Sequence, residues 1–128
     1  RAAQPPPEGP RASVRLIAPL RDRATLLRVR EAGRRGRSGP VTVRYLPVAG
    51  DDRCLVAYAI GKRTGTAVVR NRIRRRLRPL VDELALTGTL PSGALLVSAA
   101  APVAAAPFDD VRRHLGQAVA RAVGADRP

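Results

Sequence analysis

Residues 62–84 constrain the fold more than any other part of the sequence. Apolar residues recur there at spacings of three and four, which predicts an amphipathic helix from Ala67 to about Leu84. The apolar stripe consists of Val69, Ile73, Leu77, Leu80, Val81 and Leu84. Pro79 lies inside this window and cannot donate a hydrogen bond to the carbonyl of Arg75. We therefore expect the helix to bend or to end early at Pro79.

The side of this helix that faces away from the stripe is cationic. Eight cations and no acid lie between residues 62 and 78, namely Lys62, Arg63, Arg70, Arg72, Arg74, Arg75, Arg76 and Arg78. At 100° per residue, Arg70, Arg74 and Arg78 form one row. Asn71 and Arg75 form the adjacent row. Like charges at this spacing repel by roughly 0.2–0.5 kcal/mol per pair, so an anionic partner is expected on the rows.

The charge of the whole chain indicates that this partner contains phosphate. Lys and Arg number 24 against 10 Asp and Glu, which gives a net charge of +14, and Lys62 is the single lysine. Guanidinium groups bind phosphate through a planar fork of donors, and a merely solvated surface would mix both signs. No heptad zipper follows the helix, as a DNA-reading basic helix would require. A short Arg-rich helix on an α/β scaffold suits folded RNA instead.

The remaining pattern predicts one small domain with a single core, because 128 residues are too few for two ordinary domains. We expect helices and strands in the order α-β-β-α-β-α, at residues 22–32, 41–48, 54–60, 67–84, 93–98 and 109–123. The first two strands are expected to form a hairpin through a turn at residues 50–52, and residues 34–37 to cross an exposed Gly-rich loop. The last helix is expected to bury Val111, Leu115, Ala118, Val119 and Ala122.

The two ends of the chain are expected to lie outside this domain. Residues 1–20 are rich in proline and are predicted to form a mostly disordered arm. The domain is predicted to span residues 21–124, and residues 125–128 are a tail. No apolar run approaches the roughly 18 residues of a membrane span, so we expect a cytoplasmic protein without membrane contact.

No catalytic residues and no metal site are predicted in the chain itself. His114 is the single histidine and lies beside Arg112 and Arg113, where a surface or capping role is expected. Cys54 is the single cysteine, which excludes a disulfide within the chain and a zinc site built from cysteines. The carboxylates lie mostly in turns and at helix starts, where capping and solvation explain them.

The segment Gly65 to Arg78 resembles the signature of bacterial ribonuclease P proteins. That signature reads G-x-A-V-x-R-N, followed by further basic residues, and Lys62 and Arg63 lie where the family carries a basic pair before the glycine. The resemblance extends more loosely from about Arg21 to Val123. It implies an α+β fold, a two-layer sandwich with a small, mostly antiparallel sheet and a left-handed βαβ crossover, like that of a ribosomal protein domain.

The resemblance also implies a function. The chain would be the protein subunit of ribonuclease P, which helps a catalytic RNA remove the 5′ leader of precursor tRNA. Its partners would be ribonuclease P RNA and precursor tRNA, with no protein partner inferred. Mg²⁺ held by the RNA would perform the hydrolysis. The residues implied to face the catalytic RNA are Lys62, Arg63, Arg70, Asn71, Arg74, Arg75 and Arg78.

A separate cleft between the first helix and the sheet would take the single-stranded leader. The residues predicted to line it are Leu26, Arg28, Arg30, Arg44, Ala57 and Ala59. Leu26 stands where the family usually has Phe, Arg44 where a Tyr often lies, and Ala100 where an Arg often follows the third strand. Tyr45 and Tyr58 have the core-facing parity of their strands, so we expect guanidinium-to-phosphate contacts rather than base stacking in the cleft.

Two other classes of function remain open from the sequence. A ribosomal or other structured-RNA-binding protein without catalytic partner would show the same charge. A nuclease that cuts RNA by itself is disfavoured, because the sequence offers no acid/base pair.

Overall fold

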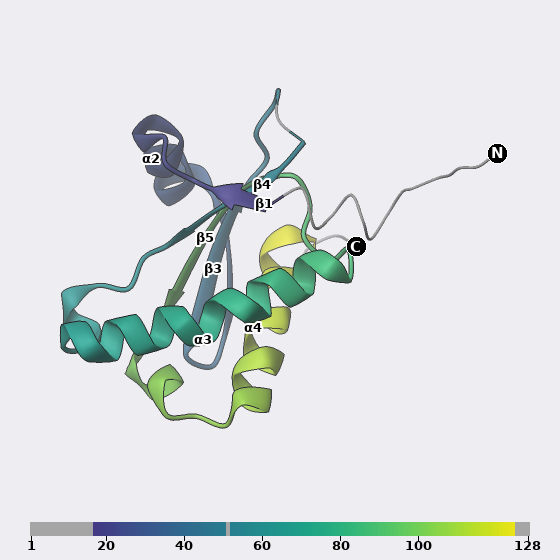
Figure 1. Ribbon diagram of the computed structural model, residues 1–128. Coiled ribbons are helices and arrows are strands. Elements are labelled where there is room, and N and C mark those ends of the chain that lie inside the picture. The colour runs from purple at the N-terminus through teal and green to yellow at the C-terminus, as the bar shows by residue number, and fades with distance from the viewer. Residues whose placement is uncertain (1–16, 51, 125–128) are drawn as a thin grey trace.

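The computed structural model describes residues 17–50 and 52–124 (Figure 1). Five strands form one sheet: β1 (Ile17–Pro19), β2 (Arg34–Ser38), β3 (Val41–Leu46), β4 (Cys54–Tyr58) and β5 (Gly93–Ala99). The α-helices are α2 (Arg23–Ala32), α3 (Ala67–Leu86) and α4 (Phe108–Val123), and the short 3-10 helices are η1 (Lys62–Thr64) and η2 (Ala101–Ala104). The α+β class is therefore confirmed.

The order of strands in the sheet is β1-β4-β5-β3-β2. The β1/β4 and β4/β5 pairs are parallel, and the β5/β3 and β3/β2 pairs are antiparallel, so the sheet is more mixed than expected. The predicted hairpin of β3 with β4 is wrong, because β5 lies between them. The physical reason is the composition of β5: Ala94, Leu95, Leu96 and Val97 are all buried, and a strand covered on both faces belongs at the centre.

The loop predicted at residues 34–37 is also wrong, because these residues form the edge strand β2. Its inward-facing positions carry Gly36 and Ser38, which look like loop residues in the sequence. A Cβ atom on Gly36 would lie only 2.2 Å from the carbonyl oxygen of Ala118 on α4. The close approach of α4 therefore requires a glycine where a strand would ordinarily show an apolar side chain.

The last four residues of the predicted arm, 17–20, belong to the folded domain. Ile17–Pro19 form β1, which pairs with β4, and Leu20 is buried with its N–H bonded to the carbonyl of Val56 at 2.9 Å. The domain therefore includes residues 17–20, which were predicted to precede it. The rest of the predicted arm and the tail at residues 125–128 lie outside the described residues.

The helices cover the two faces of the sheet unequally (Figure 1). The α3 and α4 helices pack on one face and form the main core, which includes all five residues predicted for the inner face of α4. On the other face, Val29 of α2 packs with Leu20, Ala94 and Leu96 in a smaller cluster. The parity predicted for the strands is confirmed, since Tyr45 and Tyr58 pack against the main core and Ala57 and Ala59 against the smaller cluster.

The α3 helix joins β4 to the adjacent parallel strand β5, as the resemblance implied. The left hand of this crossover stays a prediction. The early end expected at Pro79 is wrong, because α3 continues to Leu86, whereas the bend stays a prediction. Pro79 itself is exposed, whereas Leu80, Val81 and Ala85 beyond it are buried, and their burial offsets the lost hydrogen bond. Within residues 17–50 and 52–124, no helix is long and apolar enough to cross a membrane.

Replacing Ile73 by Ala tests the division of α3 into a buried and an exposed side. Ile73 has no exposed surface, so Ile73→Ala should lower the free energy of unfolding by about 2–5 kcal/mol. The measurement is urea denaturation followed by circular dichroism. Arg72→Ala, at the neighbouring exposed position, should change stability by less than about 0.5 kcal/mol. Equal losses from both variants would mean that the faces of α3 are wrongly assigned.

Candidate RNA-binding surfaces

The start of α3 is fixed by the residues of the signature. Gly65 has a φ of 153°, and a Cβ atom there would lie 3.0 Å from Cγ1 of Val69, so this position favours glycine. The Thr66 hydroxyl accepts a hydrogen bond from the N–H of Val69 at 3.3 Å and caps the helix. Lys62 and Arg63 lie in η1, immediately before this cap, and both are exposed.

In the predicted rows of α3, two arginine side chains are positioned by hydrogen bonds to neutral oxygens rather than by ion pairs with acids. The Arg70 guanidinium donates to the carbonyl of Gly65 at 3.2 Å, and the Arg74 guanidinium donates to Oδ1 of Asn71 at 3.1 Å. Arg75 is exposed. No cation of α3 forms an ion pair within the described part of the chain. The structure therefore brings together the predicted set as a positively charged surface, which we call the α3 cationic surface (Lys62, Arg63, Arg70, Asn71, Arg74, Arg75 and Arg78).

Arg76 belongs to the same run in sequence but has a different environment. Its guanidinium donates to the carbonyls of Ala104, at 3.0 Å, and Ala106. It also lies 5.6 Å from the centre of the Phe108 ring. Arg76 therefore ties α3 to η2 and to the start of α4, and its charge is used inside the protein.

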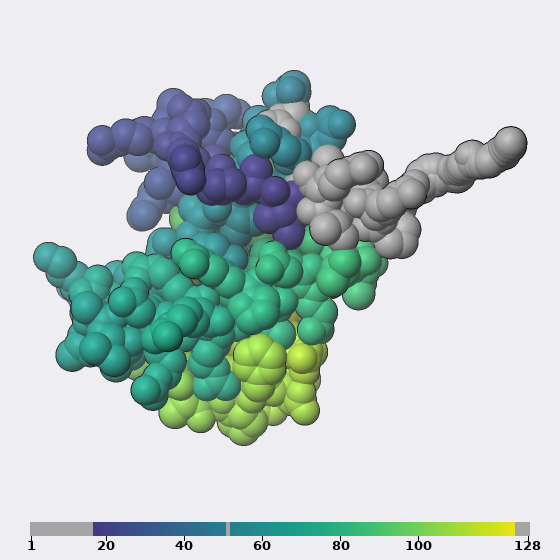
Figure 2. Space-filling model, viewed as in Figure 1, coloured from purple at the N-terminus to yellow at the C-terminus, as the bar shows by residue number. Residues whose placement is uncertain are grey.

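The second face of the sheet carries a groove beside α2. In Figure 2 the surface is hollowed between α2 and the N-terminal end of α3. Leu26 of α2 packs in the same cluster as Ala57 and Ala59 of the sheet, so three of the residues predicted for the cleft lie together. The groove continues past Ala59 to the small residues Thr42, Thr64, Ser98 and Ala100 and to Arg37.

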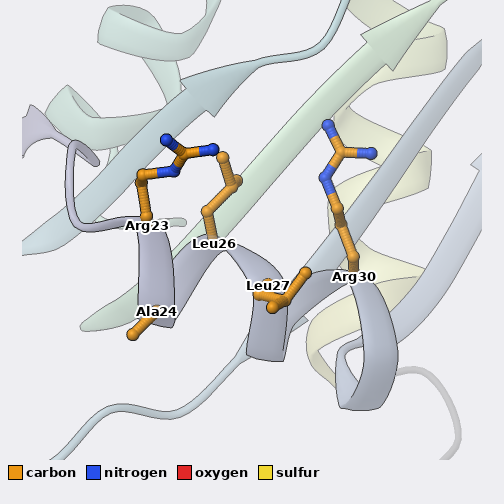
Figure 3. Close-up of a pocket in the computed structure, with 5 residues that line it drawn as sticks. All are labelled: Arg23, Ala24, Leu26, Leu27 and Arg30. Carbon is orange, nitrogen blue, oxygen red and sulfur yellow. The ribbon is translucent and has the colours of Figure 1, made fainter.

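The α2 helix carries two arginines on the same side as Leu26. Figure 3 shows the side chains of Arg23, Leu26 and Arg30 extending to the same side of α2. Arg30 was predicted for the cleft, whereas Arg23 was not. Arg28 follows Leu26 by two residues, so its side chain leaves α2 about 200° around the axis from Leu26. The structure therefore does not bring Arg28 together with the rest of the predicted cleft residues.

Two further cations of this face were missed in the sequence, because β2 reads as a loop. Gly36 and Ser38 face α4, so Arg35 and Arg37 face the opposite side, with Arg44. Arg35 is the direct cross-strand partner of Arg44. Like charges in directly opposite positions destabilise a sheet. Both Arg35 and Arg44 are at least partly exposed. The signal in the sequence was the alternation of arginine with Gly36 and Ser38.

His114 is half-buried and takes part in a network that the sequence did not reveal. Its Nδ1 lies 2.9 Å from the hydroxyl of Ser38, which donates to Oε1 of Gln117 at 2.7 Å. If Gln117 accepts from the hydroxyl, Nδ1 of His114 is the donor to Ser38. In this arrangement the imidazole cannot withdraw the proton of the serine. The network holds β2 against α4 and has no catalytic geometry.

Cys54 and the acids offer no reactive site either. Burial raises the pKa of the Cys54 thiol to about 12, so the thiolate that reacts or binds metal is absent at neutral pH. No group of three or more His, Cys, Asp or Glu residues that could hold a metal ion occurs in residues 17–50 and 52–124.

Comparison with known proteins agrees with the signature. The family model described as Ribonuclease P matches residues 17–123. A ribonuclease P protein component of Thermus scotoductus is 36% identical over 119 residues, which cover 93% of this chain and 66% of that protein. One from Kocuria rhizophila is 38% identical over 96 residues, covering 74% of this chain and 81% of that protein. The chain spans about two thirds of the length of the Thermus relatives that it matches.

Solved structures show the same fold. The RNase P protein of Thermotoga maritima superposes with a TM-score of 0.70 at 20% identity, over 84% of this chain and 99% of that one. The RNase P protein of Staphylococcus aureus gives a TM-score of 0.69 at 17% identity, over 85% and 98% of the two chains. With a family match that spans β1 to the end of α4, this chain belongs to the ribonuclease P protein family.

Proposed function

We propose that the chain is the protein subunit of a ribonuclease P, which binds the catalytic RNA and the 5′ leader of precursor tRNA. The observation that carries this proposal is the α3 cationic surface, which lies at the family's signature. Its guanidinium groups have no acidic partners among the described residues. Repulsion between these guanidinium groups lowers the stability of the free protein, and bound phosphates restore it by neutralising the charges.

In this proposal the two faces of the sheet bind different RNA molecules. The α3 cationic surface binds the phosphates of folded RNA, which lie close together and can be reached without entry into a groove. The groove beside α2 binds the leader. Its floor of small residues offers no aromatic platform, and its cations come from Arg23, Arg30, Arg35, Arg37 and Arg44. Contacts of this kind position the phosphate backbone and do not read bases.

The chemical step belongs to the RNA in this proposal. Mg²⁺ held by the RNA would supply the activated water for the hydrolysis. The protein contributes positive charge and orientation, which favours precursor over mature tRNA because only the precursor carries a leader.

The first test is reconstitution with a purified bacterial ribonuclease P RNA. We expect the chain to accelerate the cleavage of precursor tRNA at low Mg²⁺ concentration and to cleave nothing when the RNA is omitted. The readout is the appearance of the 5′-matured tRNA on a denaturing gel. Binding without acceleration would favour a structured-RNA-binding protein of another kind, and cleavage without the RNA would indicate a nuclease.

The α3 cationic surface can be tested one residue at a time. Arg75→Ala should weaken binding of ribonuclease P RNA by about 1–3 kcal/mol and leave the fold intact, since Arg75 is exposed and unpaired within the described residues. It should also reduce the slope of log affinity against log salt by about one unit. Filter binding at several salt concentrations measures both quantities.

The matched control is Arg113→Ala, which removes an exposed arginine of α4 that pairs with Asp110. Its RNA affinity should stay within about twofold of the wild type, because a rim charge that already has an acidic partner contributes little. Equal losses from Arg75→Ala and Arg113→Ala would show that net charge, rather than the α3 cationic surface, determines the affinity.

The groove leads to a different prediction, which concerns the binding of precursor tRNA rather than of the RNA subunit. Arg44→Ala should weaken the holoenzyme's binding of precursor tRNA, by about 1–3 kcal/mol, without weakening its binding of mature tRNA. Arg28→Ala serves as the control, because its side chain leaves α2 about 200° around the helix axis from Leu26. Leaders of equal length and different base composition should bind alike. A strong base preference that survives Arg44→Ala would contradict a leader site that binds only the phosphate backbone.

A further inference from the structure

A second hollow lies at the other edge of the sheet, between β1 and the C-terminal half of α3. It has a volume of about 400 Å³ and is lined by Ile17, Ala18, Pro19, Arg21, Val56, Tyr58, Arg78 and Asp82. This volume is within the range of pockets that bind small molecules. Arg78 is the last cation of the α3 cationic surface, so the pocket is continuous with that surface.

One wall of the pocket offers flat groups on which a base can stack. The guanidinium of Arg78 lies 5.8 Å from the centre of the Tyr58 ring. Tyr58 packs against the main core, which holds its ring in place. Burial, followed by the charge of Asp82, raises the pKa of Tyr58 to about 12, so its hydroxyl stays protonated at neutral pH. Asp82 lines the same pocket as Tyr58.

Asp82 is unusual on a surface that binds phosphate. It follows Arg78 by one helical turn, yet the two form no ion pair, and Asp82 has no hydrogen-bond partner among the described residues. A carboxylate repels phosphate and can only accept hydrogen bonds. Its place at the end of the α3 cationic surface therefore indicates a ligand group that offers donors, beside the phosphates that the arginines bind.

We propose that this pocket binds an unpaired guanine nucleotide of the RNA that docks on α3. The base would stack against Tyr58 and Arg78, its phosphate would meet Arg21, and Asp82 would accept hydrogen bonds from N1–H and the N2 amino group. Guanine is the base that presents two adjacent donors on its Watson–Crick edge. The other bases place a carbonyl oxygen or an unprotonated ring nitrogen beside a single donor. A carboxylate repels both of these acceptor groups.

This inference rests on the proposed function, because the nucleotide comes from the RNA bound by the α3 cationic surface. Proteins read single-stranded RNA in this manner, by stacking splayed bases on aromatic or guanidinium planes and bonding their Watson–Crick edges. The pocket would thus add base recognition at one position to a surface that otherwise binds phosphate.

The test uses the full chain and four fluorescein-labelled RNA pentamers, UUGUU, UUAUU, UUCUU and UUUUU, with affinity measured by fluorescence anisotropy. UUGUU should bind about tenfold more tightly than the other three, which is the usual discrimination of a bidentate contact with a base. Asp82→Asn should abolish this preference, since the amide replaces one acceptor by a donor. Glu83→Gln is the matched control, because Glu83 pairs with Arg112 on another side of α3, and it should retain the preference.

A second readout locates the bound base. The chain has two tyrosines, and Tyr45 donates its hydroxyl to the carbonyl of Ser92 at 2.6 Å, away from the pocket. In spectra of the chain with ¹³C-labelled tyrosine, UUGUU should shift the ring signals of Tyr58 and leave those of Tyr45 unchanged. Tyr45→Phe assigns the two sets.

The result that would overturn the inference is equal affinity for the four pentamers, or a guanine preference that survives Asp82→Asn. Reconstitution with ribonuclease P RNA separates this failure from that of the proposed function. If the chain still accelerates precursor cleavage, only the guanine pocket is lost. If acceleration is absent as well, the proposed function fails.

Discussion

The burial of β5 from Gly93 to Val97 determines the arrangement of the whole molecule. Its residues from Ala94 to Val97 need apolar cover on both faces, and none of the other four described strands has this requirement along its length. The α3 and α4 helices supply the cover on one face. On the other face, α2 covers Ala94 and Leu96, whereas Ser98 lies at the open end of the groove. The burial of β5 thus gives the chain both its core and the groove beside α2.

Local periodicity was sufficient to predict the helices and the faces of the strands. The buried positions of α3 and α4 recur at helical spacing, and Val41, Val43 and Val56 alternate with less buried neighbours. These patterns depend on residues a few positions apart. The order of strands depends instead on β5, which follows β4 in the chain after all of α3. No local pattern could show that β5 would separate β3 from β4.

The candidate site was predicted unevenly for the same reason. Except for Lys62 and Arg63 in η1, the α3 cationic surface lies on one continuous helix, so its rows could be predicted from the spacing of Arg70, Arg74 and Arg78. The groove is assembled from α2, β2 and β3, and its cations become neighbours only in the folded sheet. Arg35 and Arg37 were missed because the glycine between them made residues 34–37 resemble a loop. Gly36 is required by the close approach of the α4 backbone, which lies more than 80 residues later in the chain.

The distribution of acids separates the arginines that build the fold from those that are free to bind. Arg112 pairs with Glu83 and Asp109, and Arg76 donates to backbone carbonyls, so both are satisfied inside the protein. Arg75 and the cross-strand neighbours Arg35 and Arg44 have no acidic partner in the described structure. Each of these lowers the stability of the free chain slightly, and the loss is recovered only when an anion is bound. Asp82 is an acid that lies beside such an arginine, Arg78. In the proposed pocket it accepts hydrogen bonds from a ligand that carries donors as well as negative charge.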